Sequence, residues 1–271
     1  MKIILSRKGF DSQYGGQASP ILPDGTMLSL PIPSDDELRF SEIRWGGLCY
    51  LDIIRQLKPS TKITEGSHCH LDPDLRSECI ARPIGWMPGY GQTGSSLSEL
   101  RNNGVEVGDI FLFFGWFRHT EIKNGRYRYV KGAKDLHVIY GYLQVGSIIE
   151  REEDIPNWLL NHPHASHKNY VDAWKKGLNA IYLPTDTLSL NPRLSGAGTF
   201  NFSPHLVLTK EGCSRSKWIF PGSMRGTKIS HNPNGWKNGY FQSAAIGQEF
   251  VMDATAPVIE WVENLFSFIT F

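Results

Sequence analysis

Two long segments rich in β-branched and aromatic residues, 105–117 and 135–148, constrain the fold of this chain more than any other part of its sequence. Such residues favour the half-buried surface of a sheet. The segment between them contains Asn124-Gly125, a dipeptide typical of a two-residue hairpin turn. We therefore predict two strands here, with a hairpin between them.

Shorter elements are expected around these strands. Residues 2–5 form an apolar strand, and Ser34 with the acids after it predicts the first turn of a helix over 34–43. Further helices are expected at 95–103, 153–161, 168–176 and 258–266, and a late strand at 247–254. No series of strand–helix–strand units with a glycine-rich phosphate loop is visible, which argues against a Rossmann-type sheet. We therefore predict an α+β fold: a bent, mostly antiparallel sheet or partial β-barrel with packed helices and long functional loops.

Composition and charge exclude several classes of protein. The chain has 271 residues, of which 40% are hydrophobic and 20% charged, as in ordinary globular proteins. Its four cysteines are too scattered for a disulfide framework, and no apolar run approaches the ~20 residues that span a bilayer. With no repeat, linker or signal-peptide pattern, we expect a single compact domain over 1–271, located in the cytoplasm and without a membrane partner. The net charge of +1 gives no argument for nucleic-acid binding, so any such argument depends on local patches.

The first candidate site is the glycine-bearing turn that follows the N-terminal strand. Ser6, Arg7 and Lys8 lie where that strand ends, a position from which side chains commonly meet a ligand. Arg7 and Lys8 suit a phosphate or a base edge, and Asp11 suits acid–base catalysis or a ribose hydroxyl. The alternative is a salt-bridged turn that only stabilises the N-terminus.

A second candidate lies in 68–74, where two histidines, Cys69 and two aspartates stand close together. Because their spacing matches no standard zinc pattern, we expect no metal site. Asp72 and Asp74 flank a proline that holds the chain extended, so both carboxylates are candidates for one pocket and for acid–base catalysis. The alternative is an Asx-type turn in which Asp72 bonds its own backbone.

Nucleotide-binding candidates follow from a helix start and a strand end. Gln92 precedes the helix expected at 95–103, where free N–H groups attract anions and an amide side chain suits a base edge. Trp116 and Arg118 stand where a strongly apolar strand becomes polar, a pair suited to stacking a base and holding its phosphate. A simple helix cap and core packing of the tryptophan are the alternatives.

Basic side chains gather in the expected hairpin. Residues 123–134 contain five cations and no acid, and two tyrosines interleave with Arg126 and Arg128. This pattern suits a nucleic-acid backbone and unstacked bases, although edge hairpins also carry Lys and Arg to prevent aggregation. His162 and His164, on either side of a proline, complete the binding candidates, and no serine or cysteine nucleophile stands in a recognisable elbow to partner them.

Several segments together resemble one family. The longest are LSRKGFDSQYGG (5–16), HLDPDL (70–75), VGDIFLFFGWFR (107–118) and GQEFV (247–251). With the shorter SPILPDGT, SLPIP, Gly91-Gln92 and the histidines at 162 and 164, they extend from residue 2 to about 252. In these blocks the chain resembles the family called nucleotide modification associated domain 3, found in bacteria and phages. It differs at 95–100, where the family more often has small residues and a Gln-His-Leu pattern.

The resemblance implies base hypermodification in DNA or RNA, with a nucleotide or nucleic acid as the partner. We expect an enzyme in which Asp11, Asp72 and Asp74 act in catalysis. The sequence does not indicate which cofactor, cosubstrate or oligomeric state the protein has. The region 86–182 is also similar to PUA-like modules, including the EVE group, whose barrels bind nucleic acid and cup a flipped base. That similarity implies the alternative, a non-catalytic reader of modified bases. A protein that binds only another protein is a third interpretation.

Overall fold

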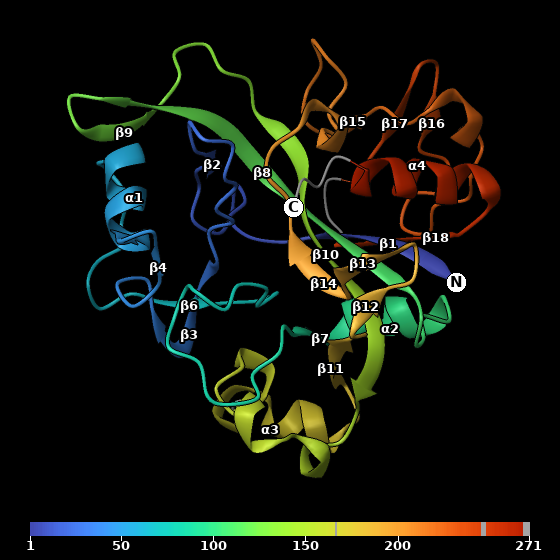
Figure 1. Ribbon diagram of the computed structural model, residues 1–271, viewed down its shortest axis with the longest axis horizontal. Coiled ribbons are helices and arrows are strands. Elements are labelled where there is room, and N and C mark those ends of the chain that lie inside the picture. Colours follow the sequence, from blue (N-terminus) through green and yellow to red (C-terminus); the bar gives the residue numbers. More distant parts are fainter. Residues whose placement is uncertain (166, 245–247, 268–271) are drawn as a thin grey trace.

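One large curled sheet organises the molecule in the computed structural model, which describes residues 1–165, 167–244 and 248–267 (Figure 1). Within these residues nine strands follow the order β18–β1–β8–β10–β11–β7, with β2 and β9 paired to β8 and β14 paired to β10. Their bounds are β1 (Lys2–Arg7), β2 (Ser19–Ile21), β7 (Tyr90–Thr93), β8 (Ile110–Lys123), β9 (Arg126–Tyr129), β10 (Leu136–Ile149), β11 (Asn179–Pro184), β14 (Ala197–Thr199) and β18 (Glu249–Asp253). Most pairs are antiparallel, β1 and β2 run parallel to β8, and the sheet bends into half of a barrel. The predicted α+β fold with a bent sheet is confirmed.

The two longest strands, β8 and β10, form the centre of this sheet and confirm the strongest sequence prediction. They pair antiparallel from Leu136 opposite Phe117 to Gln144 opposite Ile110. The predicted turn also forms, because Asn124 and Gly125 have φ values of 53° and 71° and join β8 to β9. Both residue types tolerate positive φ, which a two-residue hairpin turn requires.

Four helices and several small sheets cover the large sheet within the described residues. The helices are α1 (Tyr50–Leu57), α2 (Gly94–Asn102), α3 (His167–Lys175) and α4 (Ala256–Phe266). The small sheets pair β3 (Ile32–Arg39) with β6 (His68–His70), β4 (Arg44–Trp45) with β5 (Leu48–Cys49), β12 (Thr187–Leu188) with β13 (Asn191–Ser195), and β17 (Tyr240–Gln242) with both β15 (Lys217–Trp218) and β16 (Trp236–Lys237). In Figure 1, α1 and β3–β6 lie on one side of the sheet, α4 and β15–β17 on the other, and α3 beyond β11. No described helix combines the length and hydropathy that crossing a bilayer requires.

Two helix predictions are wrong. Residues 34–43 begin in β3, whose pairing with β6 jumps in register between Ser34 and Arg39, so the chain bulges there. The Ser34 hydroxyl donates to the Asp36 carboxylate at 2.8 Å instead of capping a helix, so tertiary pairing overrides the local capping pattern. Residues 153–161 form only short 3-10 turns, Glu152–Asp154 and Asn157–Leu159. Pro156 stands between them and disfavours helical geometry in the residue before it.

A buried histidine in β10 makes the stability of this fold depend on pH. The Nδ1 atom of His137 accepts the indole N–H of Trp218 at 3.0 Å, and burial lowers the pKa of His137 to about 3. A histidine in the unfolded chain has a pKa of about 6.5. Between these values the unfolded state binds a proton that the folded state does not bind, so stability rises with pH. The stabilising contribution is complete above the unfolded pKa and is lost as pH falls toward the folded pKa.

We expect His137→Gln to reduce this acid sensitivity, because glutamine keeps an acceptor for Trp218 but does not titrate. Between pH 7 and pH 5 the wild-type free energy of unfolding should fall by about 2 kcal/mol more than that of the variant. Urea denaturation at the two pH values measures the difference. Equal losses in both proteins would show that His137 is not the titrating group.

Candidate functional site

Two adjoining cavities lie beside the large sheet, and together they are called the hollow below. Their volumes are about 550 and 290 Å³. Both are lined by Arg7, Asp11, Tyr14, Ser96 and Gln248. The larger also meets Arg215, His231 and Glu249, and the smaller also meets Lys8, His70, Asp72, Gln92, His164 and Tyr170. Segments that are distant in the sequence therefore supply one set of walls.

The turn at 8–18 faces the hollow because of the way β1 and β2 attach to β8. Both strands pair with β8 in parallel, β1 along Ile110–Phe114 and β2 along Phe117–His119. The chain between them must leave the sheet and return, which places the turn outside the sheet edge. Gly115 permits the departure, since a Cβ there would lie 2.7 Å from the carbonyl oxygen of Lys8. Asp11 closes the turn, its Oδ1 accepting the N–H groups of Gln13 and Tyr14 at 2.7 Å each.

A buried carboxylate, Glu249 of β18, forms the floor of the larger cavity. Its Oε1 accepts from Ser6 Oγ at 3.0 Å, from Tyr90 Oη at 2.8 Å and from Gln92 Nε2 at 2.7 Å. Its Oε2 is buried and has no hydrogen-bond partner among the described residues. Burial raises the pKa of Glu249, and the nearby Lys8 acts in the opposite direction. A carboxyl group with a raised pKa is suited to exchanging protons near neutral pH.

Lys8 stands between this carboxylate and a second one. Its Nζ lies 3.9 Å from Glu249 Oε1 and 3.6 Å from Asp72 Oδ2, and 4.4 Å above the centre of the Tyr90 ring. The Lys8 side chain is only 10% exposed. Asp72 Oδ1 accepts the N–H of Gly91 at 2.6 Å and lies 3.6 Å from His162 Nε2. The arrangement places an ammonium group and two carboxylates around the inner end of the hollow.

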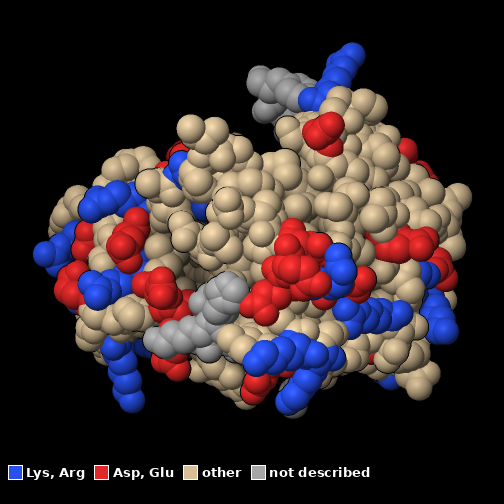
Figure 2. Space-filling model, turned by 90° about the horizontal axis from the view of Figure 1, so that it is seen from below, with Lys and Arg blue, Asp and Glu red and all other residues tan. Residues whose placement is uncertain are grey.

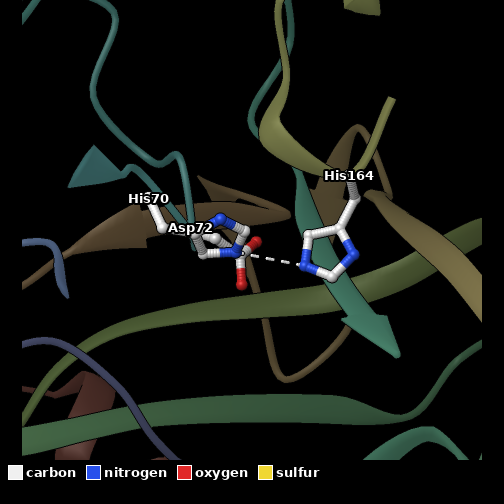
Figure 3. A group of neighbouring side chains, drawn as sticks. All are labelled: His70, Asp72 and His164. Carbon is white, nitrogen blue, oxygen red and sulfur yellow. Dashed lines mark hydrogen bonds between the residues drawn. The ribbon is translucent and has the colours of Figure 1, made fainter. Parts of the chain in front are cut away.

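Two histidines complete this inner end. His70 Nε2 and His164 Nε2 lie 3.2 Å apart, from β6 and from the 3-10 turn Pro163–Ala165 (Figure 3). Burial lowers the pKa of His164 well below its ordinary value and that of His162 to about 3. Gly91 is required beside them, because a Cβ there would lie 2.1 Å from the His164 ring.

The outer part of the hollow is suited to an anion. Arg7 and Arg215 line the larger cavity, and burial lowers the pKa of both guanidinium groups. Helix α2 begins beside them without a side-chain cap, because the Thr93 hydroxyl donates to Leu178 O instead. Ser95 and Ser96 of its first turn line the cavity. Uncapped N–H groups and the positive end of the helix dipole favour a phosphate or carboxylate at this position.

Five of the sequence-predicted binding and catalytic residues line the hollow: Arg7, Lys8, Asp11, Asp72 and His164. Gln92 also reaches the wall, but its Nε2 donates to Tyr90 and Glu249 and its Oε1 accepts from Thr93. Ser6 and His162 are buried and line neither cavity. These three side chains therefore hold the charged groups in place.

Asp74 lies apart from the hollow, although only one residue separates it from Asp72. Both of its carboxylate oxygens accept from the guanidinium of Arg82, which also stacks on Trp86 with 4.1 Å to the ring centre. Burial raises the pKa of Asp74, and Arg82 opposes that shift. This geometry is that of a structural ion pair.

The aromatic and basic residues of β8 and β9 also lie outside the wall. Trp116 and Arg118 both donate to Asp135, and the guanidinium of Arg215 covers the Trp116 ring at 4.0 Å. Arg126 and Arg128 are exposed on β9, whereas the tyrosines beside them pack toward α1. Figure 2 shows acidic and basic side chains interspersed on one face of the molecule, without a broad basic surface there.

Sequence reasoning assigned no catalytic or binding role to several residues of the hollow. Glu249 stands in the GQEFV block, whose Gly247 lies outside the described residues, and His70 stands in the HLDPDL block. Both blocks carried the family resemblance, which was the available signal. Tyr90 stands directly before the Gly91-Gln92 pair, whereas Tyr170 and Arg215 stand in no motif that the sequence offered.

Comparison with known proteins gives one match. The family model described as nucleotide modification associated domain 3 matches residues 2–253. No curated protein and no solved structure matches significantly. The similarity of 86–182 to PUA-like modules therefore stays a prediction.

Proposed function

This chain belongs to the nucleotide modification associated domain 3 family, and from that premise we propose that it is an enzyme acting on a nucleotide or on a base in DNA or RNA. The family is linked to nucleotide modification. The observation that carries the proposal is the combination of an anion-binding outer part and a buried, charged inner part in one hollow. A nucleotide likewise combines a phosphate with a polar base.

Phosphate binding is assigned to the outer part. Arg7 and Arg215 supply charge, and the first turn of α2 supplies N–H donors. The base or sugar then extends toward Asp72, Lys8 and the ring of Tyr170, which all line the smaller cavity.

Acid–base chemistry is assigned to the inner part. Asp72, whose Oδ1 accepts the Gly91 N–H and whose Oδ2 lies 3.6 Å from Lys8 Nζ, is assigned as the group that accepts a proton from the substrate. Lys8 is held between Asp72 and Glu249, and its charge opposes the rise that burial causes in the pKa of Glu249. Asp11, in the turn above them, is assigned to positioning the sugar. Asp74 is assigned to structure because Arg82 occupies both of its oxygens.

The reader alternative requires aromatic faces and cations that are available to a strand of nucleic acid. Arg215 already covers Trp116, and Tyr129 donates its hydroxyl to Ala18 O while it packs beside α1. A reader also has no need of a lysine buried between two carboxylates. These contacts favour the enzyme.

Nucleotide binding tests the proposal directly. Wild-type protein should bind nucleoside monophosphates or short single-stranded DNA or RNA in isothermal titration calorimetry. Arg215→Gln should weaken that binding about tenfold or more, because a hydrogen bond between charged groups contributes about 1.5–3 kcal/mol. Arg126→Gln, on the exposed hairpin, is the matched control and should leave the affinity unchanged. The proposal fails if no nucleotide or oligonucleotide binds at millimolar concentration, or if the two substitutions have equal effects.

A further inference from the structure

Three side chains from two distant segments of the chain direct metal-ligating atoms toward one point. His70 ends β6, Asp72 follows it after one residue, and His164 comes from the turn Pro163–Ala165. One ligand atom from each lies within 4.8 Å of the others. Figure 3 shows the two imidazole rings pointing at each other with the Asp72 carboxylate beside them.

Hydrogen bonds fix the tautomer of His164. Its Nδ1 lies 2.7 Å from Asn179 Oδ1, and the Nδ2 of the same amide donates to the backbone oxygen of His164 at 2.9 Å. The second contact determines which amide atom is the oxygen, so His164 Nδ1 carries the proton. Its Nε2 therefore presents a lone pair.

His70 is held in the same way by a carboxylate. Its Nδ1 lies 2.7 Å from Asp36 Oδ2, so this nitrogen also carries a proton. Asp36 is 5% exposed, and the bulge in β3 brings it to this position. A carboxylate or amide oxygen on the far nitrogen of each histidine is the usual outer shell of a metal-ligating imidazole.

The consequence is a pair of imidazole nitrogens that face each other, with no further hydrogen-bond donor to either from the residues that the structure describes. Two lone pairs 3.2 Å apart repel unless a cation or a proton lies between them. Two nitrogens bound at about 2.05 Å to a tetrahedral ion lie roughly 3.3 Å apart, close to the observed separation. The Asp72 carboxylate adds the negative charge that a divalent cation requires.

We propose that His70, Asp72 and His164 bind one divalent first-row transition metal ion, of which Zn²⁺ and Fe²⁺ are the best matched to this donor set. Two imidazoles and one carboxylate suit such ions, whereas Mg²⁺ and Ca²⁺ prefer oxygen ligands. The remaining coordination positions face the smaller cavity, which all three residues line. Three protein ligands with an open side are typical of a catalytic rather than a structural metal site.

The charges around Asp72 affect the strength of metal binding. Lys8 Nζ is 3.6 Å from Asp72 Oδ2 and opposes a second cation there, but Glu249 at 3.9 Å balances part of its charge. The sequence predicted no metal site because standard zinc patterns place ligands close together along the chain, whereas His164 is 94 residues from His70. Metal binding here does not depend on the nature of the substrate, and with a metal bound Asp72 serves as a ligand instead of as the free proton acceptor assigned to it above.

The test is metal binding by the full chain. Protein stripped with a chelator and dialysed should bind one equivalent of ZnCl₂ in calorimetry and one equivalent of CoCl₂ with visible absorption bands of a nitrogen- and oxygen-ligated ion. His164→Ala should weaken Zn²⁺ binding more than about 100-fold, and Asp36→Asn should weaken it about 10–100-fold by removing the negative charge that polarises the His70 ring.

His68→Gln is the matched control. His68 lies on the same strand, but its Nε2 faces Arg39 at 3.4 Å and not the cluster, so Zn²⁺ affinity should not change. Circular dichroism of each metal-free variant verifies folding. If His164→Ala does not fold, the Zn²⁺ affinity and the Co²⁺ spectrum of Asp36→Asn test the metal site instead. A wild-type protein without stoichiometric Zn²⁺ binding or Co²⁺ bands, or equal weakening by His68→Gln, would overturn the proposal.

Discussion

Asp72→Asn is expected to lower the yield of modified nucleoside by about 10²–10⁴-fold, the usual contribution of general acid–base catalysis. Asparagine keeps an oxygen that accepts the Gly91 N–H, so the local backbone should hold its shape. It loses the negative charge beside Lys8 and the ability to take a proton. Mass spectrometry of nucleosides, from DNA and RNA of cells that express each protein, measures the yield. Stability should change by no more than about 2 kcal/mol, as expected for a weakened polar contact.

Asp74→Asn provides the contrast, because the same substitution is made two residues away. It leaves the buried Arg82 without its carboxylate partner, and breaking such a pair costs about 3–5 kcal/mol. We therefore expect a clear loss of stability in urea denaturation but wild-type yield per folded molecule. Wild-type yield with Asp72→Asn, or lost yield in folded Asp74→Asn, would reverse the assignment of the two aspartates. Binding of a modified base without any turnover by the wild type would support the reader.

Lys8→Met is expected to destabilise the fold by about 3–5 kcal/mol at pH 7, because it leaves Asp72 and Glu249 without their shared cation. Burial already raises the pKa of Glu249 and Lys8 counters that shift, so removing Lys8 should raise this pKa further. The folded variant then binds a proton that the unfolded chain binds only at lower pH. By the linkage relation its stability relative to wild type must rise as pH falls. Urea denaturation at pH 7 and pH 5 measures both effects.

The double substitution Lys8→Met with Glu249→Gln is the matched control for this charge effect. Because it removes the ammonium and one carboxylate together, it should be more stable than the sum of the two single changes predicts, by about 1–3 kcal/mol. Simple additivity would mean that Lys8 acts through packing against Tyr90 and not through charge.

Local residue preferences predicted several elements correctly, even where their strands pair with distant parts of the chain. The β-branched and aromatic run of β8, the Asn124-Gly125 turn and the strand β10 followed from residue preferences alone, and so did helix α2 with Gly104 after it. The helix predicted from Ser34 failed because pairing with β6 outweighs a capping pattern. That pairing also shapes the proposed metal site, because the bulge in β3 brings Asp36 to His70.

The hollow was predicted in part. Arg7, Lys8, Asp11, Asp72 and His164 were named because polar residues in glycine- and proline-rich loops commonly serve as sites. Asp74 was grouped with Asp72 because of their spacing, but its carboxylate is paired with Arg82 outside the hollow. Trp116 was a stacking candidate, but the later loop that carries Arg215 covers its ring.

The sequence by itself determined the class of fold, the central strands and the family, because each depends on the order of residues along a short segment or on long specific blocks. Only the tertiary structure decided which charged and titratable side chains lie next to one another. Lys8 meets Glu249, and His70 meets His164, across loops that no local preference fixes. The burial that raises the pKa of Glu249 exists only once those segments have packed together, so the chemistry of the hollow follows from the folded chain.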